Sequence, residues 1–218
     1  MPSTRYQKIN AHHYRHIWVV GDIHGEYQLL QSRLHQLSFF PEIDLLISVG
    51  DNIDRGPESL DVLRLLNQPW FTSVKGNHEA MAFDAFETGD GNMWLASGGD
   101  WFFDLNDSEQ QEAIDLLLKF HHLPHIIEIT NDNIKYAIAH ADYPGSEYLF
   151  GKEIAESELL WPVDRVQKSL NGELQQINGA DYFIFGHMMF DNIQTFANQI
   201  YIDTGSPKSG RLSFYKIK

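Results

Sequence analysis

Cysteine is absent from this 218-residue sequence. Its absence excludes disulfides, thiolate metal sites and cysteine nucleophiles, so histidine, aspartate, glutamate and asparagine are the candidate ligands that remain. Long apolar runs are missing too, since none approaches the roughly 18 residues of a membrane span, and residues 1–16 contain no apolar segment typical of a signal peptide. We therefore expect a cytoplasmic protein that does not bind a membrane.

Positive charge is scarce. The chain carries 16 Lys and Arg residues against 30 Asp and Glu residues, which gives a formal net charge of -14 at pH 7. A field of this sign repels a polyanion, so nucleic acid is not an expected partner. With 43% hydrophobic residues the chain can bury a sizeable core. We expect one domain over residues 1–218, with residues 1–15 as an N-terminal extension.

The first 90 residues alternate between short apolar runs and segments of helical period. The apolar runs predict strands at 16–20, 44–49 and 71–74, and the periodic segments predict helices at 26–37, 58–67 and 79–86. Three successive units of this kind predict parallel strands joined by right-handed crossovers.

The second half changes to a β pattern after a helix that begins near Ser108, which we expect to be its cap. The predicted strands are 125–130, 134–140, 181–187, 194–203 and 211–217, with turns at 131–133 and 206–210. The fold class is therefore α/β, with two mixed β-sheets packed as a central sandwich and flanked by helices. Trp94 and Trp101 are expected in the core or in the wall of a groove.

Charged and polar residues, most of them of the types that bind metals, follow five of the predicted strands. They are Asp22 and His24 after the first strand, Asp51, Asp54 and Arg55 after the second, Asn77, His78 and Glu79 after the third, and His140 and His187 after two later strands. Ligand sites in open α/β sheets collect at the carboxyl ends of strands, so we expect these side chains to share one site.

The chemistry of this set points to a divalent cation. Carboxylate, imidazole and amide oxygen without sulfur suit Mn²⁺, Fe²⁺ or Zn²⁺. The set holds more ligands than one ion needs. Two ions about 3.5 to 4 Å apart could share a carboxylate and clamp the attacking and leaving oxygens of an in-line displacement at phosphorus.

The motifs carry a family resemblance over about residues 16–205. "GDIHG" at 21–25, "GDNIDRG" at 50–56, "GNHE" at 76–79, the isolated His140 and "FIFGH" ending at His187 resemble the phosphoprotein phosphatase family of calcineurin-like metallophosphoesterases. Together with "HADYP" and "ELLW", they resemble its phage-lambda-type bacterial branch. The resemblance implies the metallophosphoesterase fold.

The resemblance also implies a role for each matching residue. The first ion would be bound by Asp22 and His24, the second by Asn77, His140 and His187, and Asp51 would bridge both. His78 would donate a proton to the leaving alkoxide and would be held by Asp54, while Arg55 would bind the phosphate. Arg165, which follows "LLWPVD", is expected as a second phosphate-binding arginine.

The function that these roles imply is a metal-dependent serine/threonine protein phosphatase, with some phosphotyrosine activity. A metal-bridging hydroxide would attack phosphorus directly, and manganese is the expected metal, with iron and zinc as alternatives. Phosphorylated proteins would be the partners. Two alternatives stay open: a dinucleoside polyphosphate hydrolase or phosphodiesterase of the same fold, and a non-catalytic metal-binding scaffold. The oligomeric state and the physiological substrates are not determined by the sequence.

Overall fold

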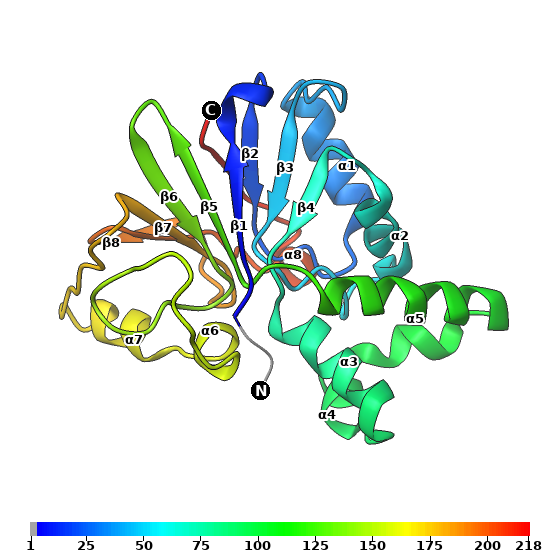
Figure 1. Cartoon of the computed structure of the whole chain (residues 1–218). Helices are drawn as coiled ribbons and strands as arrows, with labels where there is room; N and C mark the ends of the chain where they lie inside the picture. Colours follow the sequence, from blue (N-terminus) through cyan, green and yellow to red (C-terminus); the bar gives the residue numbers. More distant parts are fainter. Residues whose placement is uncertain (1–3) are drawn as a thin grey trace.

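The computed structural model describes residues 4–218 and contains two mixed β-sheets that face each other (Figure 1). The smaller sheet has the strand order β10-β2-β3-β4 and the larger one β1-β5-β6-β7-β9-β8. The predicted α/β sandwich is confirmed. The strands are β1 (Tyr6–Asn10), β2 (Ile17–Val20), β3 (Leu45–Ser48), β4 (Phe71–Ser73), β5 (Ile126–Asn131), β6 (Ile134–Ile138), β7 (Tyr182–Phe185), β8 (Gln194–Phe196), β9 (Gln199–Tyr201) and β10 (Phe214–Lys216).

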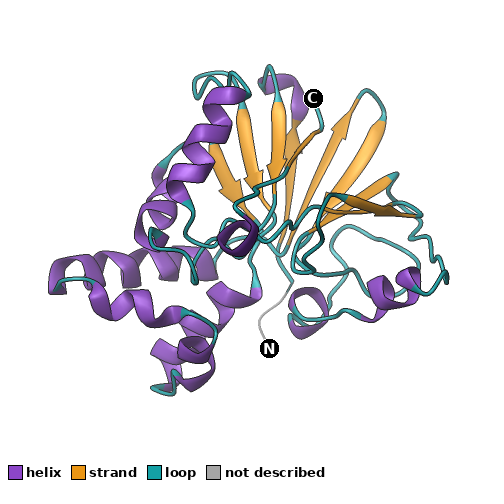
Figure 2. Cartoon of the chain, turned by 180° about the vertical axis from the view of Figure 1, so that it is seen from behind, coloured by secondary structure: helices purple, strands orange, loops and turns teal. Residues whose placement is uncertain are grey.

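Helices cover the outer faces of the sandwich (Figure 2). Buried side chains of α1 and α2 pack with β2, β3 and β4, whereas those of α6 and α7 pack with β6, β7 and β9. Within residues 4–218, no helix has the length and apolar character to cross a membrane. The helices are α1 (Tyr27–Gln36), α2 (Ser59–Arg64), α3 (Asn77–Thr88), α4 (Asn92–Ala96), α5 (Asp107–His121), α6 (Ser157–Leu160), α7 (Asp164–Leu170) and α8 (Ser206–Ser209).

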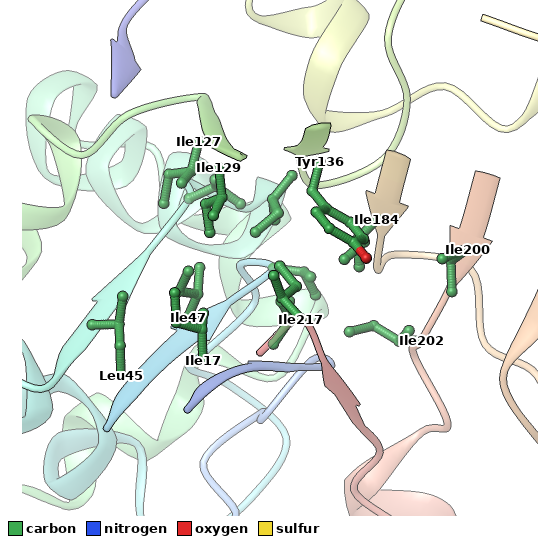
Figure 3. Packing of buried hydrophobic residues seen from close by; sticks show 14 of the residues in the cluster. Ile17, Leu45, Ile47, Ile127, Ile129, Tyr136, Ile184, Ile200, Ile202 and Ile217 are labelled. Atoms are coloured by element: carbon green, nitrogen blue, oxygen red, sulfur yellow. The ribbon is translucent and has the colours of Figure 1, made fainter. Parts of the chain in front are cut away.

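The main core lies between the two sheets (Figure 3). Ile17 and Ile47 of the smaller sheet meet Ile127 and Ile129 of the larger one, and all four side chains are fully buried. Alternate residues of a strand point to opposite faces, so Ile126 packs in a different cluster from its neighbour Ile127. Burial of both faces of both sheets explains why their strands are so rich in β-branched residues.

The register of the smaller sheet brings three strand ends to one level. β2 and β3 run parallel with Val20 opposite Ser48, and β3 and β4 run parallel with Ser48 opposite Ser73. The three loops that follow therefore begin side by side at the same edge of the sheet. The three predicted strand-then-helix units are confirmed, and this register places their polar residues together.

The N-terminal segment differs from the prediction. Residues 1–15 were expected to be an extension, but Tyr6–Asn10 form β1, which pairs in parallel with β5 from Tyr6 opposite Ile126. β1 is an edge strand of the larger sheet, and Ile9 packs against the core between the sheets. The segment YQKIN has no apolar run that would predict a strand, because none of its five side chains is fully buried.

Three local predictions were wrong. The single strand expected at 194–203 is the hairpin of β8 and β9, which turns at Ala197 with a φ of 50°. The turn expected at 206–210 contains the short helix α8. The cap of α5 is Asn106 rather than Ser108, since the Asn106 side chain accepts hydrogen bonds from the backbone N–H groups of Ser108 and Glu109.

A partly buried ion pair connects the loop after β4 to the start of α6. Lys75 Nζ lies 2.8 Å from one carboxylate oxygen of Glu156, and His125 Nε2 lies 2.8 Å from the other. The side chain of Lys75 is only 2% exposed. Burial by itself would raise the pKa of Glu156, but the hydrogen bonds from His125 and Lys75 hold it at about 2.

The substitution Glu156→Gln should lower the free energy of unfolding at pH 7 by about 3 kcal/mol, because it leaves the Lys75 ammonium buried without a counter-charge. Urea denaturation measures this loss. Glu158→Gln, an exposed neighbour on α6, is the matched control. Since the pKa of Glu156 is lower in the folded protein, its contribution is present above about pH 4.5 and is lost as the pH falls towards about 2. Equal losses for the two variants would contradict this account.

Candidate metal centre

The loops that follow β2, β3, β4, β6 and β7 meet at one end of the two sheets, near α8 (Figure 1). Backbone hydrogen bonds connect these loops directly. The backbone N–H of His24 donates to the backbone carbonyl of Asp51 over 2.9 Å, and the backbone N–H of Gly186 donates to the backbone carbonyl of His140 over 2.8 Å. The structure thus brings together the strand ends that the sequence pattern assigned to one site.

Asp51 lies at the centre of this cluster and is shared by two groups of potential metal ligands. Its carboxylate forms one group with His24 and His78 and another with His140 and His187, and within each group the ligand atoms lie within 4.8 Å of one another. A carboxylate shared between two such groups has the placement that a bridging ligand requires.

Hydrogen bonds to backbone carbonyls determine which ring nitrogen of His24 and of His140 is free to bind a metal. His24 Nδ1 lies 2.9 Å from the carbonyl of Ile53, and His140 Nδ1 lies 2.8 Å from the carbonyl of Val49. A carbonyl only accepts, so in both rings Nδ1 carries the proton and Nε2 turns its lone pair towards the cluster. Burial lowers the pKa of His24 to about 3, and burial with nearby His140 lowers the pKa of His187 to about 4. These rings are therefore neutral at pH 7.

Asn77 adds an oxygen to the second group. Its Oδ1 lies 2.7 Å from His140 Nε2 and 3.1 Å from His187 Nδ1. Because His140 Nε2 carries a lone pair, this oxygen and the ring nitrogen repel each other unless a cation lies between them. Turning the amide over would let its nitrogen donate to both rings, whereas a divalent cation would hold the oxygen inward. The donor set suits a cation of borderline hardness.

Asp22 lies beside the cluster, outside both groups, and its carboxylate accepts the backbone N–H of His187 over 3.0 Å. Burial raises the pKa of Asp22 well above its ordinary value, and the carboxylates of Asp203 and Asp51 raise it further. Carboxylates buried this close together are costly unless positive charge neutralises them. The cluster therefore fits a divalent cation. Asp203 was missed as part of the site, although it follows a strand just as the other acids do.

His78 forms a second unit with Asp54. His78 Nδ1 lies 2.6 Å from Asp54 Oδ2, and Asp54 is fully buried. The indole N–H groups of Trp94 and Trp101 donate to Asp54 Oδ1 over 2.9 and 2.7 Å. Three donors thus hold this carboxylate. The predicted burial of both tryptophans is correct, but their role as donors was missed, because nothing in the sequence shows where an indole N–H points.

The guanidinium of Arg55 lies over the cluster. Its Nη1 is 2.8 Å from His24 Nε2, and its Nη2 is 2.9 Å from His78 Nε2. With His187 and Asp203 it lines a hollow of about 270 Å³. A cation on His24 would compete with Arg55 for the same lone pair, which would leave the fork of Arg55 for an anion in this hollow.

Arg165 lies in a different environment. Its Nε donates to Asp142 Oδ1 over 2.8 Å, and its Nη2 donates to the carbonyls of Tyr143 and Gly145 over 2.9 and 2.7 Å. None of the hydrogen bonds that Arg165 makes within residues 4–218 reaches the metal cluster. Arg165 connects α7 to the loop that follows His140. Its contact with a phosphate stays a prediction.

Glu79 fastens two of the motif loops together. Its carboxylate accepts the backbone N–H groups of Asp51, Asn52 and Gly76 over 3.1, 2.6 and 2.9 Å. Burial and nearby Asp51 raise the pKa of Glu79 to about 7, although these N–H groups favour its charged form. A Cβ on Gly76 would collide with Asp51, so only glycine allows this approach.

Backbone strain is concentrated in the same loops. Residues other than glycine rarely adopt a positive φ, and each such residue costs about 1 kcal/mol or more. Five residues of the site do so, namely His24 at 47°, Asp51 at 50°, Asp54 at 73°, Arg55 at 72° and His187 at 64°. The surrounding hydrogen bonds hold these turns and aim the side chains into the cluster.

The fold and this cluster define a class of metal-binding phosphoesterase. The family model of calcineurin-like phosphoesterases matches residues 15–190, and the chain belongs to that family. Over its full length of 218 residues the chain is 98% identical to serine/threonine-protein phosphatase 2 of Escherichia coli (strain K12), and it covers all of that protein. It is 60% identical, again over the full length of both chains, to serine/threonine-protein phosphatase 2 of Salmonella typhimurium.

Solved structures share the fold. One described as a putative diadenosine tetraphosphatase superposes with a TM-score of 0.73 at 23% identity, covering 98% of this chain and 94% of the other. At this identity the likeness concerns the fold alone. The arrangement of two mixed sheets with flanking helices is therefore shared between proteins with different names.

The hydrogen bond from Trp101 to Asp54 can be tested by Trp101→Phe, which keeps an aromatic ring but removes the N–H donor. We expect the free energy of unfolding to fall by about 2 kcal/mol, because a buried carboxylate loses a donor. Trp18→Phe is the matched control, since the buried indole N–H of Trp18 has no partner in the described part of the chain. A loss for Trp101→Phe no larger than that of the control in urea denaturation would contradict this role.

Proposed function

We propose that this protein is a metal-dependent serine/threonine protein phosphatase that hydrolyses phosphoserine and phosphothreonine in proteins, with some activity on phosphotyrosine. The observation that carries the proposal is the His78–Asp54 pair, whose 2.6 Å contact lies beside the cluster centred on Asp51 and would suit a proton donor next to a metal site. The full-length identity of 98% to a protein of that name supports it.

The metal centre would hold two divalent ions, with manganese as the proposed metal and iron or zinc as alternatives. Asp22 and His24 would bind one ion, Asn77, His140 and His187 the other, and Asp51 both. Bound divalent ions supply charge stabilisation for the phosphoryl oxygens and activation of water. The two neutral imidazoles fixed by the carbonyls of Ile53 and Val49 are suited to this task.

His78 supplies the proton that the leaving group needs. When the P–O bond of a phosphoserine breaks, its electron pair stays on the serine oxygen, and an alkoxide leaves slowly unless it is protonated. His78 Nδ1 is held by Asp54, so Nε2 can carry a proton to that oxygen once Arg55, whose Nη2 lies 2.9 Å from Nε2, turns to the phosphate. Burial lowers the pKa of His78, but Asp51 and Asp54 more than offset this and raise it. General acid catalysis of this kind accelerates a reaction by about 10² to 10⁴.

Arg55 orients the phosphate. Its two terminal nitrogens lie side by side at the mouth of the cluster, within 2.9 Å of His24 and His78. A guanidinium presents two parallel N–H groups that match two oxygens of one phosphate. Arg55 and His187 line a hollow of about 270 Å³ in which we expect the phosphorylated side chain to bind.

The same cluster could serve another phosphoester. A dinucleoside polyphosphate hydrolase or a phosphodiesterase would need the same metals, and the shared fold does not separate these activities. A non-catalytic scaffold would have no need of a proton donor held in place by three hydrogen bonds to its partner carboxylate. The cytoplasmic location stays a prediction of the sequence.

Substrate comparison tests the proposal. Metal-stripped protein is reloaded with Mn²⁺, and initial rates are measured for a phosphoserine peptide, a phosphotyrosine peptide, a dinucleoside tetraphosphate and a phosphodiester. We expect phosphate release mainly from the peptides and its loss on addition of a chelator. Asp51→Ala serves as the control for contaminating phosphatases, because it removes the carboxylate shared by both ligand groups. Faster hydrolysis of the dinucleotide or the diester would refute the proposed substrate class.

The role of His78 is tested by comparing leaving groups. His78→Ala should lower kcat by about 10² or more for an alkyl phosphoester such as a phosphoserine peptide, and by much less for p-nitrophenyl phosphate. The aryl oxide is stable without a proton, whereas the alkoxide is not. Equal losses on the two substrates would show that His78 is not the general acid.

A further inference from the structure

Three adjoining hollows lead away from the metal cluster along one side of α8. The first is the hollow over the cluster. The second, of about 470 Å³, shares Met189 and Lys208 with the first. The third, of about 560 Å³, shares Asp191, Thr204 and Arg211 with the second. We call the second and third hollows together the basic trough.

The charge of this trough is opposite to that of the whole chain. Among its lining residues, Arg33, Lys208 and Arg211 are cationic, and Asp191 is the one acid. The chain as a whole has only 16 Lys and Arg residues and a net charge of -14. Asp191 offsets part of the charge of Arg211, since the two side chains lie 3.2 Å apart. The trough is thus a locally positive strip on an acidic protein.

Arg33 has hydrogen-bonding capacity to spare. Its guanidinium lies 6.0 Å from the centre of the Phe214 ring, and its Nη1 donates to Gln36 over 2.7 Å. Its buried Nε has no acceptor within the described residues 4–218. Lys208 and Arg211 are exposed, and no carboxylate of the described residues lies within ion-pair distance of Lys208 or Arg33. Two of the three cations are therefore unpaired.

The trough is continuous with the place where a phosphorylated residue would bind. A protein substrate whose phosphoserine lies over the cluster must lay its flanking residues on the adjoining surface. An extended chain advances by about 3.3 Å per residue, so the next few residues on one side of the phosphoserine can follow the trough. Charge complementarity of this kind selects partners more strongly than it adds affinity.

We propose that the basic trough binds acidic residues that flank the phosphorylated residue of a protein substrate and so determines which phosphoproteins are hydrolysed. The inference rests on the proposed phosphatase function. Arg33, Lys208 and Arg211 act as specificity-determining residues, and Asp191 weakens their effect. Met189 and Lys208 line both the first and the second hollow and so connect the cluster to the trough.

Two phosphoserine peptides test the trough. They differ only in carrying glutamate or glutamine at the positions around the phosphoserine. We expect wild-type protein to have the higher kcat/KM on the glutamate peptide. The double variant Arg33→Gln/Arg211→Gln should lower the ratio of the two kcat/KM values by about threefold to tenfold, because exposed ion pairs are individually weak. Added salt should reduce the wild-type ratio in the same direction.

Matched variants separate the trough from net charge and from folding defects. Lys119→Gln/Lys168→Gln makes the same change in charge at exposed lysines outside the three hollows and should leave the ratio unchanged. Asp191→Asn should raise the ratio, since it removes the acid of the trough. The Asp191 side chain is 96% exposed, so this variant does not disturb the core.

The outcomes distinguish the two proposals. Equal kcat/KM values for the two peptides in wild-type protein would overturn the trough and leave the phosphatase function intact. Hydrolysis of a dinucleoside tetraphosphate but of neither peptide would overturn both. If Arg33→Gln/Arg211→Gln slowed only the dinucleotide, the trough would serve a polyphosphate chain, and the proposed selection of acidic protein substrates would be wrong.

Discussion

The carboxylate of Glu79 is the contact on which the site depends most. It accepts three backbone N–H groups, two from the loop after β3 and one from the loop after β4. Loops of this kind leave donors that no strand or helix satisfies, and an unpaired buried N–H costs about 1 to 3 kcal/mol. By pairing these donors, Glu79 holds Asp51 and Asn77 at the separation that a shared metal site needs.

The buried carboxylates of the centre differ in how their negative charge is neutralised. Asp54 is neutralised by the ring of His78 and stabilised by two indole donors, so it needs no metal. The carboxylates of Asp203 and Asp51 raise the pKa of Asp22, and the carboxylate of Asp51 raises the pKa of Asp203, so these buried acids are costly to ionise together. Divalent cations resolve this imbalance, which connects the affinity for metal to the surplus of buried acid.

The basic trough carries local positive charge on a chain whose net charge is negative. A chain with a net charge of -14 repels anionic partners at long range, and this keeps most of its surface unattractive to them. Arg33, Lys208 and Arg211 gather in the trough beside the cluster and so concentrate local attraction along the path by which a substrate would enter. Attraction concentrated in this way would favour selection among phosphorylated substrates, since an anion bound at a distant cation would lie away from the metal centre.

From the amino-acid sequence we predicted the strands β2, β3, β4, β5, β6 and β7 and the helices between them, with small shifts at their ends, and we grouped the polar residues that follow β2, β3, β4, β6 and β7. This succeeded because apolar periodicity and glycine-flanked motifs are local properties. Three features could be seen only in the folded chain: β1 belongs to the larger sheet, Trp94 and Trp101 donate to Asp54, and Arg165 pairs with Asp142. These contacts join residues distant in the chain, and the direction of an N–H group or a guanidinium depends on packing that no local pattern records.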